Sequence, residues 1–403
     1  MIRPQPATWF EIIAARDDTR AAIESLAAAG CAEIESRDAG TGSTADIARA
    51  CLLFQSAEGD GIFSRITGWT SDPRKLAACL QRSEARALVH FPRMPEHLQA
   101  PLLLRNPEWV QPFEVFSRLA GMPGRYSTDP SGLLMFVAPL LFGYMFGDVV
   151  QGLVLVVAGL VLQRRWPMTR LLVAGGLAAI LFGFVFGSAA SIHGAVPALW
   201  LDPLDEPLPV LLAPLAFGAA LLAVGLLFNG VEAYWRGGLA AWLTGDAGFL
   251  VLYVGAMLAF VHPAGQVLAL AGTALFVLGR VRRDRRAGAA LGAIGELIEK
   301  SAQILINTVS FVRVGAFAMA HAGLSSALAA MADAAGSCVP YVLVLLFGNI
   351  VIVAIEVMVA SIQTTRLILF EFFTRFFAST GREFHPLPST SPSPEEKKNE
   401  PNS

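Results

Sequence analysis

The sequence predicts a small α+β cytoplasmic domain followed by a polytopic α-helical membrane domain. The chain has 403 residues, of which 54% are hydrophobic and only 15% are charged, whereas soluble globular proteins usually have about 25% charged residues. Residues 1–130 carry ordinary charge density, but residues 131–380 are mostly apolar runs broken by short polar loops. We therefore expect a cytoplasmic domain at 1–125, a transmembrane domain at 126–380 and a Pro/Ser-rich disordered tail at 381–403.

The N-terminal domain shows two successive strand–helix–strand patterns. They are strand 9–14, helix 17–29 and strand 31–35, then strand 61–69, helix 73–85 and strand 87–92. The first helix ends at Gly30 and the second begins at Pro73, which are typical residues for those positions. Two such units in close succession predict a ferredoxin-like α+β fold. The domain has no glycine-rich phosphate loop and no nucleophile–His–acid arrangement, so we expect a docking surface there rather than an enzyme site.

Composition argues against several other classes of protein. The four cysteines are too scattered for a disulfide framework or a zinc site. No apolar segment with a cleavage site precedes Trp9, so we expect no signal peptide. The net charge of −2 gives no sign of nucleic-acid binding. We expect neither a metal nor a cofactor.

Eight apolar segments are expected to form membrane-spanning helices. They lie at 131–147, 149–163, 169–190, 209–233, 239–261, 264–280, 290–332 and 338–377. Most are close to the roughly 20 residues that cross the hydrocarbon core, and the last two are longer, so they must tilt or extend beyond the membrane surface. Arginines gather in alternate loops, above all at 280–286, whereas the other loops have no Lys or Arg. This asymmetry places both termini in the cytoplasm.

Two arginines, Arg313 and Arg366, lie deep inside the last two apolar segments. A guanidinium cannot be deprotonated at ordinary pH, and at the bilayer centre it costs at least about 2.5 to 3.5 kcal/mol. Such residues persist where they face a protein interior or a wet cavity and meet an anionic partner. Since no run of carboxylates here obviously matches both arginines, we expect their partner on another chain.

The polar residues of the seventh segment lie on one side of its helix. On a helical wheel they fall within about 120°, together with Phe317, and they are Glu299, Gln303, Asn307, Ser310, Arg313, His321 and Ser325. In the eighth segment Asn349, Glu356 and Gln363 recur every seven residues, and Arg366 lies about 60° from that stripe. Each of these helices therefore has one polar seam.

The depth of the polar residues suggests two aqueous half-paths. Glu299 lies roughly 21 Å to the cytoplasmic side of Arg313, and His321 roughly 12 Å to its outer side. Glu356 lies roughly 15 Å outside Arg366, because the eighth helix runs the other way. A proton could move among Glu356, His321 and water but not through an arginine. The arrangement suits two paths that end at a cationic barrier.

Other interpretations compete with this one. Seam residues such as Ser310 and Gln363 can simply join neighbouring helices by hydrogen bonds. Glu299 can be an ordinary interfacial residue, and a lone His321 is more often a satisfied core histidine. A secondary transporter that binds an anionic substrate with its arginines is a second hypothesis, although transporters often place such spans in two related halves. A purely structural membrane anchor leaves the buried arginines unexplained.

Three segments resemble the membrane-embedded a subunit of V-type and A-type rotary ATPases, called subunit I in bacteria and archaea. NTVSFVRVGAFAMAHAGLS is similar to the family segment that holds an essential arginine and a histidine, here Arg313 and His321. QTTRLILFEFFTRFFASTGREFHPL is similar to its last span, with Arg366 as the second arginine. FGYMFGDVVQGL matches its first hairpin. The resemblance covers the chain apart from the tail and points to a short bacterial form.

The resemblance implies a stator subunit that couples proton or sodium translocation to ATP hydrolysis or synthesis. Its two arginines would face the carboxylates of a proteolipid c-subunit ring. Residues implied to line the two ion half-channels are Glu299, Gln303, Asn307, Ser310, His321, Glu356 and Gln363. The implied partners are this ring, the peripheral stalk, other ATPase subunits and membrane lipid. The implied location is the bacterial inner membrane.

The chain also departs from the family pattern. The cytoplasmic domain of relatives usually has two lobes joined by a long coiled coil, but only about 25 residues separate the two strand–helix–strand units here. The usual double contact with peripheral stalks therefore cannot be carried over. No Gly-x-x-x-x-Gly-Lys-Ser/Thr loop is present, so the chain itself is not expected to hydrolyse ATP. The sequence leaves open proton or sodium, and synthesis or hydrolysis.

Overall fold

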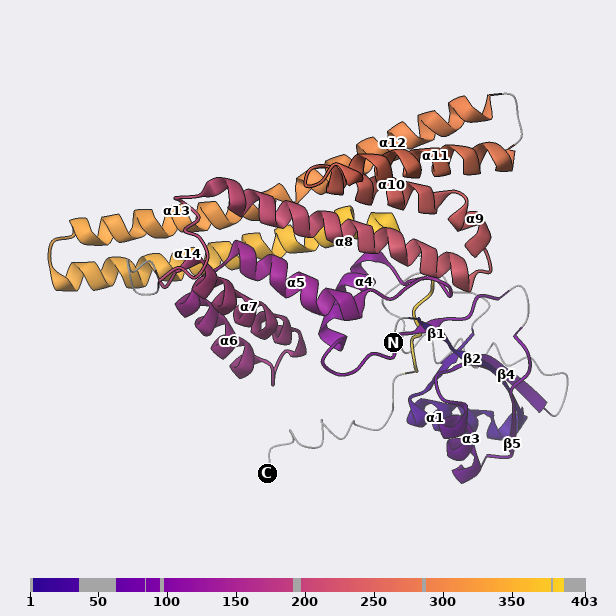
Figure 1. Cartoon of the computed structure of the whole chain (residues 1–403). Coiled ribbons are helices and arrows are strands. Elements are labelled where there is room, and N and C mark those ends of the chain that lie inside the picture. Colours follow the sequence, from indigo (N-terminus) through magenta and orange to yellow (C-terminus); the bar gives the residue numbers. More distant parts are fainter. Residues whose placement is uncertain are drawn as a thin grey trace, which may run out of the picture. The chain divides into compact units, whose positions relative to one another are not determined.

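The computed structural model of the chain describes residues 3–35, 63–83, 85–94, 98–190, 197–284, 288–377 and 380–387. They form two compact units (Figure 1). One is helical and comprises residues 106–121 and 126–378. The other contains a β-sheet and comprises residues 3–105, 122–125 and the segment after 379. The predicted combination of a helical, membrane-type domain with a small N-terminal β-sheet domain is confirmed.

A four-stranded antiparallel sheet organises the smaller unit. Its strands, in spatial order, are β3 (Ala32–Ile34), β4 (Phe63–Thr70), β2 (Thr8–Ala15) and β5 (Ala87–His90). Helices α1 (Thr19–Ala29) and α3 (Pro73–Arg82) supply the apolar side chains that cover one face. Gly30, at φ +59°, ends α1, and the Asp72 carboxylate accepts backbone N–H bonds at the start of α3. A short pair, β1 (Gln5–Pro6) with β6 (Leu102–Leu103), lies beside this sheet in the same unit.

The C-terminal segment 381–387 covers part of the other face of this sheet. Phe384 is buried against the edge-on pair Trp9 and Trp69. Arg382 makes 3.0 Å ion pairs with both Glu33 and Glu35. The sequence had placed residues 381–387 in a disordered tail; they are instead held by contacts to residues about 350 positions earlier, which composition alone cannot reveal. Residues 388–403 lie outside the described part.

We expect Phe384→Ala to destabilise the smaller unit by about 3 kcal/mol, the usual cost of deleting a buried phenyl ring. Arg382→Ala should cost about 1 kcal/mol, because its ion pairs are partly exposed. Burial raises the pKa of Glu33, and Arg382 opposes that rise. The raised pKa means that Glu33 costs stability once it is ionised, so the effect of Arg382→Ala should shrink as the pH falls below that pKa.

Proteolysis of the sheet-containing unit in the detergent-solubilised full chain measures both effects. Arg74→Ala, an exposed residue of α3, is the matched control. Cleavage as slow in Phe384→Ala as in this control would show that the C-terminal segment does not stabilise the unit.

The helical unit is built from apolar helices joined by short turns. Its elements are η2 (Gln111–Phe113), α4 (Glu114–Ala120), α5 (Ser131–Met145), α6 (Val149–Leu162), η3 (Pro167–Thr169), α7 (Arg170–Phe186), α8 (Pro207–Trp235), α9 (Leu239–Leu243), α10 (Asp246–Ala259), α11 (Ala264–Asp284), α12 (Ala289–Ser310), α13 (Val312–Ala334), α14 (Cys338–Arg366), the π-helix η4 (Leu367–Phe372) and η5 (Phe373–Arg375). Five helices of the described chain are long and apolar enough to cross a membrane, and α5, α6 and α7 are shorter apolar helices.

Small residues let these helices approach closely. Gly248 of α10 and Gly272 of α11 have no room for a β-carbon, because the backbone of the facing helix occupies that space. Such contacts replace the hydrophobic driving force that is missing between helices in lipid. The last helix is covered least, with only 11% of its most apolar stretch buried. It packs along α13 (Figure 1), and many of its large apolar side chains are exposed in the described chain.

Both polar-seamed helices change their geometry near the arginines. The seventh segment, expected as one helix at 290–332, is interrupted at Phe311, between α12 and α13. The Phe311 ring is fully buried and lies against Gly218 of α8. The eighth segment, expected at 338–377, changes from α to π geometry directly after Arg366. A π turn inside a helix is rare and is frequently found at functional sites.

Candidate functional site

The Arg313 side chain lies at the start of α13 and joins it to α14. Its Nη1 donates to Gln363 Oε1 at 3.2 Å, and its Nη2 donates to Ser310 Oγ at 3.3 Å. The nearest carboxylate oxygen is Glu371 Oε1, at 4.0 Å from Nη2. The structure thus brings together three of the residues singled out in the sequence and adds a fourth, Glu371, that had not been noticed.

Arg313 opens onto the surface of the helical unit. About a quarter of its side chain is exposed, and it lines a hollow of about 500 Å³ with Leu305, Ile306, Val309 and Ser310. The three apolar residues of this hollow are more than half exposed. A permanent cation therefore lies at the edge of an apolar surface that the described chain leaves uncovered.

Arg366 is the last residue of α14 and is exposed. No described residue forms a hydrogen bond or an ion pair with its guanidinium. Its neighbours on the same helix, Ile362 and Phe370, are also more than half exposed. Neither arginine therefore forms a close ion pair with a described residue, and the carboxylate of Glu371 lies 4.0 Å from Arg313.

Glu371 lies in the π-helix and is only 5% exposed. Its Oε2 is buried without a hydrogen-bond partner among the described residues. The only sequence signal for it was a carboxylate inside an apolar run, five residues after Arg366. A regular helical wheel could not place it, because the π turn changes the angular position of each residue that follows.

His321 and Glu356 form a buried pair between α13 and α14. His321 Nδ1 lies 2.5 Å from Glu356 Oε2, and His321 is 4% exposed. Its Nε2 and the hydroxyl of Ser325 are buried without a hydrogen-bond partner in the described part of the chain. An imidazole held by a carboxylate on one nitrogen keeps the other nitrogen available for proton exchange.

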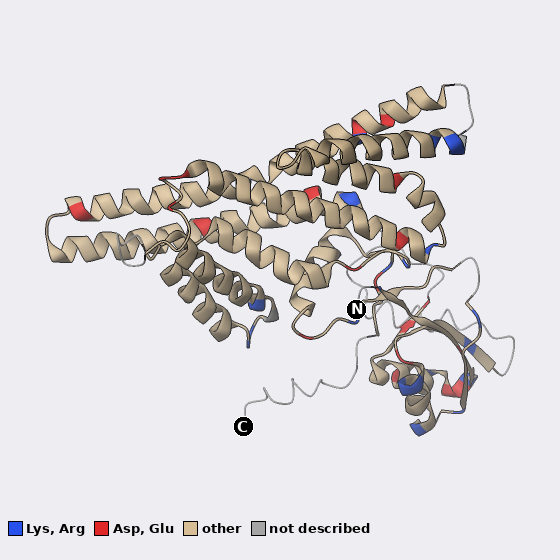
Figure 2. Cartoon of the chain, in the orientation of Figure 1, with Lys and Arg blue, Asp and Glu red and all other residues tan. Residues whose placement is uncertain are grey.

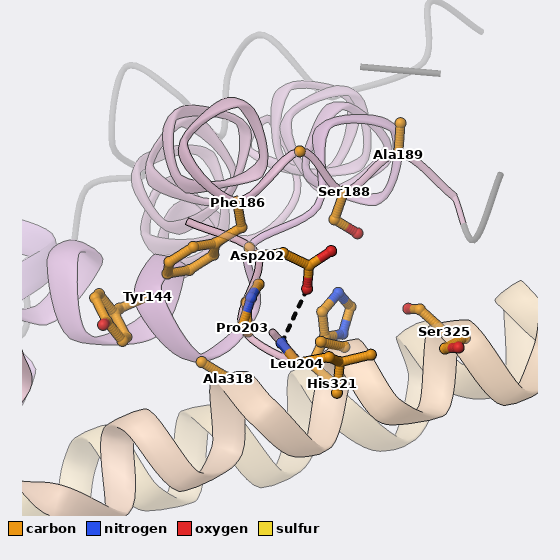
Figure 3. Close-up of a pocket in the computed structure, with 14 residues that line it drawn as sticks. Tyr144, Phe186, Ser188, Ala189, Asp202, Pro203, Leu204, Ala318, His321 and Ser325 are labelled. Carbon is orange, nitrogen blue, oxygen red and sulfur yellow. Dashed lines mark hydrogen bonds between the residues drawn. The ribbon is translucent and has the colours of Figure 1, made fainter. Parts of the chain in front are cut away.

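A cavity of about 150 Å³ leads to the free side of this histidine. Figure 3 shows His321 and Ser325 on α13 facing Asp202 and Ser188, which come from the loop before α8 and the end of α7. Asp202 itself accepts the backbone N–H of Leu204 at 2.9 Å. The cavity is lined by both polar and apolar side chains, and it is large enough to hold several water molecules. It is therefore suited to connect the His321–Glu356 pair with solvent.

The inner residues are less closely associated. Glu299 and Gln303 are exposed on α12 and do not contact Arg313. With its amide oriented so that both ends are paired, Asn307 accepts hydrogen bonds from Arg375 Nε at 3.3 Å and Nη2 at 2.8 Å. Arg375 is a further cation that the sequence analysis did not single out. Of the three inner residues, only Asn307 contacts this arginine-rich region.

Asn349 joins neighbouring helices by hydrogen bonds, the structural role considered above for polar residues of the seams. Its Oδ1 accepts from Gln151 Nε2 at 2.8 Å, and its Nδ2 donates to the Ala190 carbonyl at 3.2 Å. The neighbouring Asp148 caps α6 and accepts from Ser188 Oγ at 2.9 Å. These bonds attach α14 to the α6–α7 hairpin, seven residues from Glu356, and so help to fix its register.

Comparisons with known proteins give consistent matches. No family model matches the chain. The chain is 28% identical over 367 residues to the A-type ATP synthase subunit I of Thermococcus kodakarensis, covering 80% of this chain and 54% of that protein. It is 26% identical to the proteins of the same name from Pyrococcus horikoshii and Halobacterium salinarum, over 74% and 71% of this chain. The chain spans about half the length of these relatives.

Proposed function

Because this chain is a relative of the A-type ATP synthase subunit I proteins, the family that its motifs resemble, we propose that it is the stator subunit that moves ions past the rotor of an A/V-type ATPase. Its partner at the membrane is a ring of proteolipid c subunits, each with one carboxylate. The observation that carries this proposal is Arg313: a permanent cation at an open apolar surface, with no described carboxylate within hydrogen-bonding distance.

Ion movement follows from the charges in this arrangement. A ring carboxylate that reaches Arg313 is held in its ionised form, because the guanidinium stabilises the anion strongly in a low-dielectric region. Its ion therefore leaves before the contact forms, and a new ion is taken up after the carboxylate has moved on. Arg313 also prevents a proton from passing directly between the two half-paths, since it cannot give up its own. Arg366 extends the positive region along the same surface.

The two half-paths are assigned to the polar residues on either side of the arginines. His321 and Glu356 form the inner end of the outer path, which the 150 Å³ cavity connects to solvent. Glu299, Gln303 and Asn307 line the cytoplasmic path, and Ser310 and Gln363 hold Arg313 between the two paths.

We place the chain in a bacterial inner membrane with eight crossings and both termini in the cytoplasm. Support comes from the arginines at the α6–α7 turn and at the end of α11 (Figure 2), and from the three shorter apolar helices beside the five long ones.

The smaller unit is proposed to be ferredoxin-like, since its strand order β3-β4-β2-β5 and its two helices on one face suit that fold. It would dock the peripheral stalk and other ATPase subunits. No observation favours the transporter hypothesis.

Purification in mild detergent tests this proposal. We expect a small proteolipid and nucleotide-binding subunits to copurify with the chain. A stable solitary chain that binds organic anions would contradict the motor assignment and favour a transporter.

A further inference from the structure

The buried carboxylate of Glu371 has no use in the mechanism given above. It is 5% exposed, and its Oε2 has no hydrogen-bond partner among the described residues. Leaving a buried polar atom unpaired is costly, so it calls for an explanation. We propose that Glu371 is the internal counter-charge to which Arg313 returns when no rotor carboxylate is opposite it. This inference rests on the proposed function and deepens it.

The distances suit an exchangeable partner rather than a fixed ion pair. Charge-assisted N–H···O bonds are typically about 2.7 to 2.9 Å long, but Arg313 Nη2 lies 4.0 Å from Glu371 Oε1. The hydrogen bonds of Arg313 go to the neutral acceptors Gln363 and Ser310 instead. The carboxylate thus lowers the electrostatic cost of the guanidinium without saturating its donors. Those donors stay available to a second carboxylate from outside.

The charged groups of the described chain that act on Glu371 are cations rather than other carboxylates. Arg313 of α13 and Arg366 at the end of α14 both act on it electrostatically, and Arg375 follows it on η5. From α12, Ser310 lies beside Arg313, and the Asn307 side chain is near the Glu371 carbonyl. The π-helix turns this side chain toward Arg313 while Phe370 stays on the exposed surface. The π-helix therefore places a buried negative charge near the Arg313 guanidinium.

The consequence for turnover is a competition for Arg313. While a rotor carboxylate is opposite, Arg313 binds it; when the rotor steps, Glu371 takes over the interaction and lowers the cost of release. Without Glu371, Arg313 would hold each rotor carboxylate longer. Glu371 is thus a positioning residue that acts through Arg313 and does not itself carry the ion.

The test compares Glu371→Gln with the native chain in the complete, reconstituted ATPase complex. We expect ATP-driven pumping per assembled complex to fall about tenfold at neutral pH, which corresponds to roughly 1.4 kcal/mol. The difference should shrink as the pH falls, because protonation neutralises Glu371 in the native chain as the substitution does. A merely structural role would lower the rate by the same factor at every pH. Asp333→Asn, at the exposed end of α13, is the matched control.

Glu371→Asp keeps the charge but withdraws it by one methylene, so it should give an intermediate loss with the native form of pH dependence. If Glu371→Gln does not assemble, this variant still decides: native pumping at all pH values in Glu371→Asp would overturn the inference. A pH-independent loss in Glu371→Gln would overturn it as well. If Arg313→Gln abolishes pumping, the proposed function stands, and these outcomes decide only the role of Glu371. If Arg313→Gln pumps normally, the proposed function itself fails.

Discussion

Replacing Arg313 by glutamine is expected to abolish ATP-driven ion pumping while the chain still assembles into its complex. The variant loses the permanent cation that holds a rotor carboxylate ionised and that separates the two half-paths. Removing one preorganised charge-stabilising donor typically lowers a rate by about 100- to 1000-fold, and here the barrier to leakage is lost too. Pumping should therefore fall by at least about 100-fold.

Assembly should survive because the local contacts of Arg313 are modest. Its hydrogen bonds go to two neutral side chains, and a quarter of its own side chain is exposed. Acidification of vesicles that contain the purified complex measures pumping, and the amount of proteolipid that copurifies measures assembly. Arg164→Gln, at the exposed α6–α7 turn, is the control that removes a cation without touching the site. Normal pumping in Arg313→Gln would remove Arg313 from the role proposed for it.

Removing either member of the His321–Glu356 pair should lower pumping less than Arg313→Gln does. His321→Ala leaves Glu356 without its 2.5 Å contact, whereas Glu356→Gln keeps a possible hydrogen bond to His321 but removes the carboxylate that can carry a proton. Loss of one partner of a buried hydrogen bond costs about 1 to 3 kcal/mol, so we expect a loss of roughly tenfold. Pumping should not be abolished, because water in the adjoining cavity can still carry a proton toward the rotor.

The double variant separates a shared path from two independent effects. If the two residues form one relay, the loss in His321→Ala with Glu356→Gln should be smaller than the product of the single losses. Asn349→Ala serves as the comparison, since Asn349 attaches the same helix to the α6–α7 hairpin but does not contact the pair. Pumping at the native rate in both single variants would make His321 and Glu356 structural.

The sequence predicted which side of each helix carries the polar residues, because helical periodicity is a local property. Arg313, Ser310 and His321 were placed on one side of a helix by their spacing alone, and Gln363 and Glu356 by a seven-residue repeat. Since α13 and α14 are regular over most of their length, the structure pairs Arg313 with Gln363 and His321 with Glu356. The seams follow from the position of each residue on its own helix, but which residues face each other across the two helices is given by the structure.

Three features could not be obtained in this way. Glu371 lies in a π turn near Arg313, and the apolar residues of that turn, such as Leu367 and Phe372, are buried in a core shared with other helices. Arg375 meets Asn307 only because the segment that follows α14 lies near α12. Glu299 and Gln303 have the right spacing for the seam, but both side chains remain exposed in the described chain.

By itself, the sequence determined that this chain has an apolar helical domain with two polar seams and a small β-sheet domain, because hydropathy and periodicity act within one element at a time. Only the tertiary structure decided that segment 381–387 completes the sheet-containing unit and that Glu371 is the carboxylate nearest Arg313. Both depend on contacts between residues far apart in the chain or on a locally irregular backbone. Such contacts form only when the chain folds, and the residues that make them have no regular spacing in the sequence.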